Sequence, residues 1–121
     1  MLEKYQTKRL LDIAFLGCQR GETALARKVI AGLDLLLDDS VELEICRAMS
    51  HYTVDEFEPA REVLTAALDR FPNEPLLGIH LALVDHLTDQ DFQARERLDQ
   101  VLASDADSDV LALARAIREE C

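Results

Sequence analysis

Apolar residues recur along this chain at helical spacing, and the pattern repeats every 34 residues. Its register is marked by two alanine trios, Ala26, Ala60 and Ala94, and Ala14, Ala48 and Ala82. Four positions after the first trio stand branched apolar residues, Ile30, Leu64 and Leu98. Two helices approach closely only where a small side chain lies at the crossing point, so the alanines predict three helix pairs packed in the same way.

Thirty-four residues is the period of the tetratricopeptide repeat, a helix–turn–helix unit whose copies stack into a right-handed superhelix. In this register the repeats span residues 7–40, 41–74 and 75–108. A further helix over 109–120 carries Val110, Leu113, Ala114 and Ile117 at helical spacing, as expected for a helix that caps the open end of the stack. We therefore expect an all-α protein of seven helices, with residues 1–121 forming a single tetratricopeptide-like domain.

The turn positions fit the same register. Gly21, Asp55 and Asp89 share one place in the three rows, between the two helices of each repeat. Glycine there suits a backbone with positive φ, and aspartate can cap the helix that follows. Between repeats, residues 38–40 and 71–75 are rich in residues that end one helix and cap the next.

Composition limits the classes of partner. Hydrophobic residues make up 49% of the chain and charged residues 31%, which is typical of a globular protein. The 24 acidic and 13 basic residues give a formal charge of −11, which disfavours nucleic acids and anionic membrane surfaces. The acidity is compatible with a basic or neutral protein partner, although it also serves solubility alone.

Cysteine usage and the N-terminal sequence favour the cytoplasm. Cys18, Cys46 and Cys121 form no short-spaced motif, and an odd number cannot close a disulfide framework, so reduced thiols are expected. No apolar run approaches the roughly 20 residues of a membrane span, and the first residues lack the layout of a secretory signal.

No residue pattern indicates a metal, a cofactor or catalysis. The three histidines and the cysteines do not match a zinc spacing. Residues 105–109 begin like a calcium loop, D-x-D-x-D, but Val110 stands where the loop needs glycine, so helix capping explains these aspartates better. Phosphate loops, nucleophile elbows and Ser/His/Asp arrangements are absent from the sequence, and a non-enzyme is expected.

The repeat family implies an inner surface, because the second, fifth, ninth and twelfth residues of each first helix line the concave side. Of the twelve positions that result, two are charged, Lys8 and Glu42, and nine are apolar. We take the remaining ten as a candidate partner-binding groove: Leu11, Phe15, Cys18, Ile45, Met49, Tyr52, Leu76, Ile79, Leu83 and His86.

An apolar groove of this kind matches the apolar stripe of an amphipathic helix. Phe15 would be an anchoring contact and Met49 an adaptable one. Two other occupants remain open: a second copy of the chain, or the chain itself through its C-terminal helix or its first few residues.

Residues 10–18 (LLDIAFLGC) and 24–30 (ALARKVI) resemble small bacterial tetratricopeptide-like chaperones of type III secretion that hold the needle subunit. The shared features are a short helical opening, an apolar helix ending near a glycine, and a second helix with A-x-x-x-I/V. The resemblance implies that the groove clasps the amphipathic C-terminal helix of the needle protein in the cytoplasm and prevents premature polymerisation. It also implies a small helical co-chaperone on the outer surface near residues 2–30.

Two alternatives accompany this hypothesis. Chaperones of translocator proteins also use these repeats, but they resemble longer chains with an extra N-terminal segment. A generic adaptor or a self-associating scaffold would bind a different helical partner. Two measurements separate these hypotheses. A chaperone should be poorly soluble or oligomeric without its partner, and it should form a stable complex when it is co-expressed with the needle protein.

Overall fold

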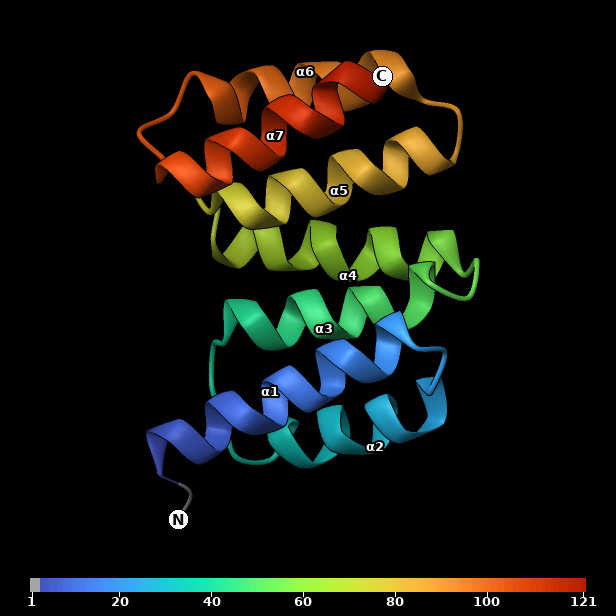
Figure 1. Ribbon diagram of the computed structural model, residues 1–121, viewed down its shortest axis with the longest axis vertical. Coiled ribbons are helices and arrows are strands. Elements are labelled where there is room, and N and C mark those ends of the chain that lie inside the picture. The colour runs from blue at the N-terminus through green and yellow to red at the C-terminus, as the bar shows by residue number, and fades with distance from the viewer. Residues whose placement is uncertain (1–2) are drawn as a thin grey trace. The chain divides into compact units, whose positions relative to one another are not determined.

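The computed structural model describes residues 3–121, and within them it contains seven helices and no strand (Figure 1). The helices are α1 (Lys4–Gln19), α2 (Thr23–Asp34), α3 (Val41–Tyr52), α4 (Phe57–Arg70), α5 (Pro75–Leu87), α6 (Asp91–Leu102) and α7 (Ser108–Glu120). The predicted all-α fold and the number of helices are confirmed. The capping helix begins at Ser108, one residue before the predicted start.

The helix starts follow the 34-residue period. The second helix of each repeat begins at Thr23, Phe57 and Asp91, which are spaced 34 residues apart. Helices α3 and α5 begin at Val41 and Pro75, as the register predicts. The first helix begins before the predicted first repeat, because α1 starts at Lys4 and not at residue 7.

The turn inside each repeat uses a left-handed residue at the predicted place. Gly21, Asp55 and Asp89 have φ values of 78°, 64° and 61°. Aspartate tolerates this region better than most residues, since its short side chain bonds locally. The predicted capping role is wrong for Asp89, because Gln90 is the N-cap of α6 and makes no side-chain cap bond. What the three rows share is therefore backbone conformation, and glycine and aspartate are alternative ways to reach it.

A backbone hydrogen bond accompanies each left-handed residue. The N–H groups of Glu22, Glu56 and Gln90 donate to carbonyls five residues earlier, at 2.8, 3.0 and 2.8 Å. Such a bond satisfies a carbonyl that would otherwise lack a partner at the end of the first helix, as in a Schellman motif. The same turn therefore closes all three repeats.

Caps between repeats form largely as the sequence predicts. The Ser40 hydroxyl accepts from the Leu43 N–H at 3.2 Å, and the Glu74 carboxylate accepts from the Leu76 N–H at 3.5 Å. Capping does not explain the aspartate before α7, because Asp107 is at the N-cap position but makes no side-chain cap bond. This part of the sequence interpretation is wrong.

The residues that marked the period are core residues. All six alanines of the two trios are 0% exposed, and Ile30, Leu64 and Leu98 are at most 3% exposed. Helices α1 and α2 pack closely at Gly17, where an added Cβ would lie 3.2 Å from the Cβ of Ala26. Small side chains at the crossings thus permit the close packing that the spacing predicted.

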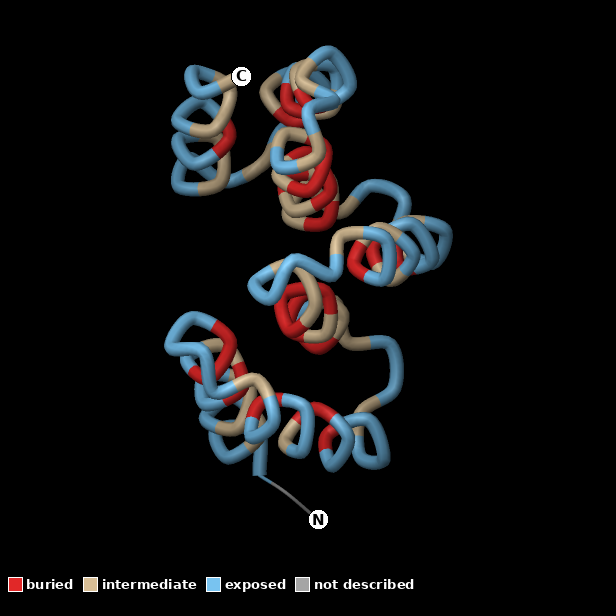
Figure 2. Tube along the Cα trace, turned by 90° about the vertical axis from the view of Figure 1, so that its right-hand side faces the viewer, coloured by how far each residue is buried: buried red, intermediate tan, exposed pale blue. Residues whose placement is uncertain are grey.

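By compactness the chain forms two units, Met1–Val63 and Leu64–Cys121, which we call the N-terminal and the C-terminal unit. Their boundary lies within α4. Each unit has an apolar cluster of its own, and Figure 2 shows buried positions in red along the helices and mostly exposed turns in pale blue. The single-domain assignment stays a prediction.

Candidate functional site

Exposure divides the ten predicted groove residues into two sets. Four are buried, with exposed fractions between 2% and 4%: Cys18, Ile45, Met49 and Ile79. Six are partly buried: Leu11, Phe15, Tyr52, Leu76, Leu83 and His86. The charged inner positions Lys8 and Glu42 are exposed. A partner that approaches these helices can therefore reach only the second set without rearrangement.

In the N-terminal unit, Leu11 and Phe15 lie on α1 and pack against the apolar cluster of that unit. The cluster is formed by Ala14, Ile30, Leu33, Leu43 and Cys46. The Cys46 thiol also donates to the Leu11 carbonyl, with sulfur and oxygen 3.8 Å apart. Because both side chains rest on a packed layer and keep part of their surface outward, they are held in place for a contact.

The thiols and the phenol of this unit are placed for packing. The Cys18 thiol donates to the Cys46 carbonyl at 3.8 Å, and both cysteines are buried. Burial raises the pKa of the Cys46 thiol to about 12. Burial also raises the pKa of the Tyr52 hydroxyl, and the nearby Cys18 and Cys46 raise it further. A thiol reacts as its thiolate, so these groups stay neutral and unreactive at physiological pH.

In the C-terminal unit, α7 packs against α5 and α6 (Figure 1). Leu76 and Ile79 belong to one apolar cluster with Val110, Ala114 and Ile117 of α7. The C-terminal helix thus covers these two positions, which is one of the occupants that the sequence left open. Leu113, which the sequence placed on the same apolar face, is 42% exposed.

A charged cluster joins three elements of the N-terminal unit. Arg27 on α2 donates to the Ser50 carbonyl at 2.8 Å and pairs with the Glu56 carboxylate at 2.5 Å. His51 Nδ1 lies 2.8 Å from the same carboxylate. The hydrogen bonds from His51 and from Arg27 lower the pKa of Glu56, which remains charged. The cluster secures the end of α3 and the turn after it.

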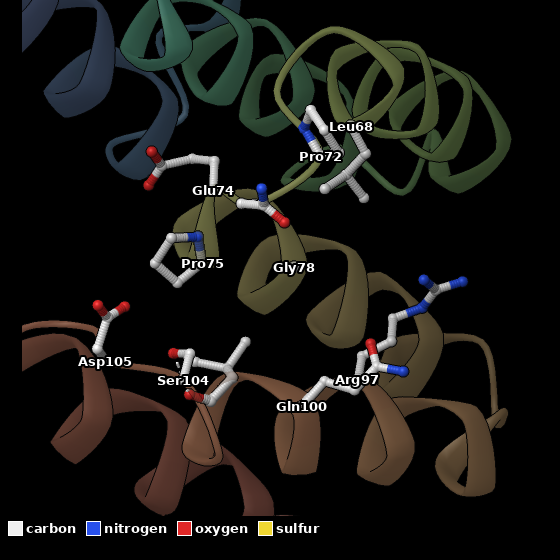
Figure 3. Close-up of a pocket in the computed structure, with 11 residues that line it drawn as sticks. Leu68, Pro72, Glu74, Pro75, Gly78, Arg97, Gln100, Ser104 and Asp105 are labelled. Carbon is white, nitrogen blue, oxygen red and sulfur yellow. Dashed lines mark hydrogen bonds between the residues drawn. The ribbon is translucent and has the colours of Figure 1, made fainter.

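A cleft of about 490 Å³ opens in the C-terminal unit between the turn before α5 and the end of α6. In Figure 3, Leu68 and Pro72 lie on one side, Gln100 and Ser104 on the other, and Gly78 between them.

Two polar side chains of this cleft already have partners within the unit. Arg97 Nε donates to the buried Asp85 carboxylate at 2.8 Å, and the Ser104 hydroxyl donates to the Val101 carbonyl at 2.6 Å. None of the ten predicted residues lines the cleft. We assign it no role in partner binding.

The structure brings together three side chains that the sequence did not connect. Donor atoms of His86, Asp91 and Cys121 all lie within 4.8 Å of one another. They come from α5, the start of α6 and the residue after α7, so their spacing in the sequence matches no zinc motif. Only packing of α7 against the other two helices reveals the group.

Sequence comparison gives no family, because no protein-family model and no curated protein matches the chain. Within the residues that the structure describes, helices that combine the length and the apolar character of a membrane span are not found.

Solved structures of bacterial chaperones match nearly the whole chain. PcrH in complex with the chaperone binding region of PopB has a TM-score of 0.73 and 18% identity, over 96% of this chain and 97% of that chain. PcrH from Pseudomonas aeruginosa has a TM-score of 0.76 and 18% identity, with 99% and 94% covered. The Yersinia enterocolitica type III secretion translocator chaperone SycD has a TM-score of 0.80 and 15% identity, with 98% and 92% covered.

At identities of 15–18% such similarity establishes the fold. The seven helices, the 34-residue register and these matches agree. The chain therefore has the tetratricopeptide-like helical fold of PcrH and SycD.

Proposed function

We propose that this protein is a cytoplasmic type III secretion chaperone that binds an apolar segment of an exported subunit and keeps it from associating prematurely. The observation that carries the proposal is the similarity to PcrH, solved with the chaperone binding region of PopB, over 96% of the chain. The apolar character of the inner helix positions supports it independently, since an apolar surface can mask an apolar segment without chemistry.

A translocator is the exported subunit that we propose first. The similar structures are those of a translocator chaperone and of PcrH bound to part of PopB. The length of the chain does not argue against this class, because the solved chains are matched over 92–97% of their own length. A needle subunit, to which the sequence resemblance points, is the second candidate partner.

The partly buried inner residues other than Leu76, which packs in the cluster with α7, are the contacts that we propose for this segment. In the N-terminal unit these are Leu11, Phe15 and Tyr52, and in the C-terminal unit Leu83 and His86. The four other inner residues, Cys18, Ile45, Met49 and Ile79, are buried and contribute to the core. Within the N-terminal unit, Leu11 and Phe15 lie one helical turn apart on α1, so a partner segment with apolar residues at every third or fourth position could meet them along one face.

Co-expression distinguishes the two partner classes. The chain is produced with the chaperone binding region of a translocator or with a needle subunit, and each complex is measured by light scattering and calorimetry. We expect a stable complex with the translocator segment. If only the needle subunit binds, the needle subunit and not the translocator is the partner. If neither binds, the chaperone proposal is contradicted.

Substitution of Phe15 by glutamate tests the surface. We expect Phe15→Glu to weaken binding by about 2 kcal/mol or more, roughly 30-fold, because an anchoring aromatic would be lost and a charge placed in an apolar contact. Phe92→Glu is the matched control, since Phe92 lies on α6 and is 66% exposed. Equal affinity of the two variants would place the partner elsewhere. Met49 is less suitable, because it is 4% exposed and glutamate there would disturb folding.

We also propose that a small helical co-chaperone binds the chain in addition to the exported subunit. Exposed apolar side chains on α1 and α2 offer a surface for it. Ile13, Leu16 and Leu25 are 44%, 45% and 49% exposed there, and Tyr5 is 66% exposed. Leu16→Lys is expected to abolish co-chaperone binding and to leave binding of the exported segment unchanged. Loss of both would show that this substitution acts through folding.

A further inference from the structure

His86, Asp91 and Cys121 form a compact group at one end of the C-terminal unit. His86 Nδ1 lies 2.7 Å from the Asp91 carboxylate, and the donor atoms of all three residues lie within 4.8 Å of one another. The His86 and Asp91 side chains are 31% and 42% exposed, and Cys121 is partly buried. The group is therefore accessible from solvent and backed by protein.

The three donors are an imidazole nitrogen, a carboxylate oxygen and a thiol sulfur, a combination that suits zinc better than calcium or magnesium. We propose that His86, Asp91 and Cys121 bind a zinc ion, with water as the fourth ligand, and that the ion fastens the end of α7 to the turn between α5 and α6. Three protein ligands and a water molecule are the arrangement of an open tetrahedral zinc site.

The geometry requires only small movements. Zinc–ligand distances of about 2.0–2.3 Å place the donors of a tetrahedral site roughly 3.3–3.8 Å apart. The contact between His86 and Asp91 must therefore lengthen by about 1 Å, and no other separation needs to shorten by more than about 1 Å. Rotation of side chains that are partly exposed can supply both changes.

Proton release accompanies binding. The Cys121 thiol loses its proton to solvent when sulfur binds the metal, and His86 binds the metal through a ring nitrogen that carries no proton. Burial raises the pKa of the Cys121 thiol, and Asp91 raises it further, whereas Arg95 and Arg118 lower it. Arg95 also donates to the Cys121 carbonyl at 2.8 Å, which holds Cys121 beside the group.

The N-terminal unit supplies a matched control. His51 Nδ1 lies 2.8 Å from the Glu56 carboxylate, nearly the same contact as that between His86 and Asp91. Within the described residues, however, no thiol or third carboxylate completes a metal-binding group there. The two histidine–carboxylate pairs therefore differ in the cysteine and in Arg27, which pairs with Glu56.

The test uses the full chain, stripped of metal and then titrated with Zn²⁺, Co²⁺ or Mg²⁺. Zn²⁺ at a hundred times its Kd should raise the folding equilibrium constant about 100-fold and the Tm by roughly 10 °C. Co²⁺ should give a thiolate-to-cobalt charge-transfer band and the strong visible absorption of a tetrahedral site. Mg²⁺ should do neither.

Variants assign the ligands. Cys121→Ser and His86→Gln should lose the cobalt band and weaken Zn²⁺ binding by about tenfold or more, while His51→Gln should behave as the wild-type protein. Unfolding without metal shows whether each variant is folded before it is titrated. A cobalt band that survives Cys121→Ser, or a Zn²⁺ response of the wild-type protein no larger than that to Mg²⁺, would overturn the proposal.

Discussion

The two units are built from the same kind of repeat, but different elements pack on the first helix of their repeats. In the C-terminal unit, α7 covers Leu76 and Ile79 of α5. In the N-terminal unit, Leu11 and Phe15 of α1 pack on their cluster and keep part of their surface outward. Equivalent positions of a repeat therefore meet different surroundings, and the covered position contributes to the core whereas the open one can serve binding.

Exposed apolar residues follow the same division. In the described part of the N-terminal unit the large exposed apolar side chains are Tyr5, Ile13, Leu16, Leu25, Leu35, Leu36 and Val54. In the C-terminal unit they are Leu87, Phe92 and Leu113. The N-terminal unit carries more of these side chains, and it is therefore where we expect most of the partner contacts.

The largest expected effect compares two residues at the fifth position of their rows. Ile79→Ala should lower the free energy of unfolding by about 2–5 kcal/mol, because Ile79 is 2% exposed and the substitution leaves a cavity. Leu11→Ala should cost only about 1 kcal/mol, since a partly buried side chain loses less packing. Urea unfolding measures both. Equal costs would show that the two inner positions are covered alike.

An intermediate effect concerns acid stability in the C-terminal unit. Burial lowers the pKa of His80 from 6.5 to about 4. Below pH 6.5 the unfolded chain takes up a proton that the folded chain refuses until about pH 4, so stability should fall in this window as the pH decreases. We expect a loss on the order of 1–3 kcal/mol from this residue.

His80→Gln isolates that contribution. The difference in unfolding free energy between pH 7 and pH 4.5 should be smaller in the variant than in the wild-type protein, because glutamine does not titrate. Carboxylates contribute to both proteins and cancel in the comparison. An identical pH dependence would mean that the His80 ring is hydrated in the folded state.

The smallest expected effect compares the turn in the two units. Gly21→Ala should destabilise by about 1 kcal/mol, because its φ is +78° and alanine is strained there. Asp89→Gly should change stability by less than about 1 kcal/mol in the favourable direction, since glycine relieves strain at a φ of +61° but loosens the unfolded chain. Thermal unfolding measures both, and a destabilised Asp89→Gly would show that the aspartate side chain contributes beyond backbone conformation.

Local features of the sequence were sufficient for the helices. The 34-residue spacing predicted the starts of α3 and α5, and the turn residues between helices, because both depend on neighbouring residues and on a small side chain at each crossing. The role of Asp89 was misassigned, since aspartate is common both as a cap and as a left-handed residue and the sequence does not separate the two.

The candidate groove was only partly accessible to sequence reasoning. A helical register predicts which side of a helix a residue occupies, and it placed Leu11 and Ile79 at equivalent positions. It does not say which element packs there, and α7 decides that for Ile79. Sequence reasoning therefore predicted which residues occupy the inner positions, but not how many of them remain exposed to a partner.

The sequence by itself determined the repeat, its period and the apolar nature of its inner positions, because these follow from side-chain size and hydrophobicity at regular spacing. Tertiary structure alone decided which inner residues α7 covers and brought His86, Asp91 and Cys121 together. The reason is distance along the chain: periodicity describes neighbours on a helix, whereas exposure and metal-binding groups arise when helices far apart in sequence pack against one another.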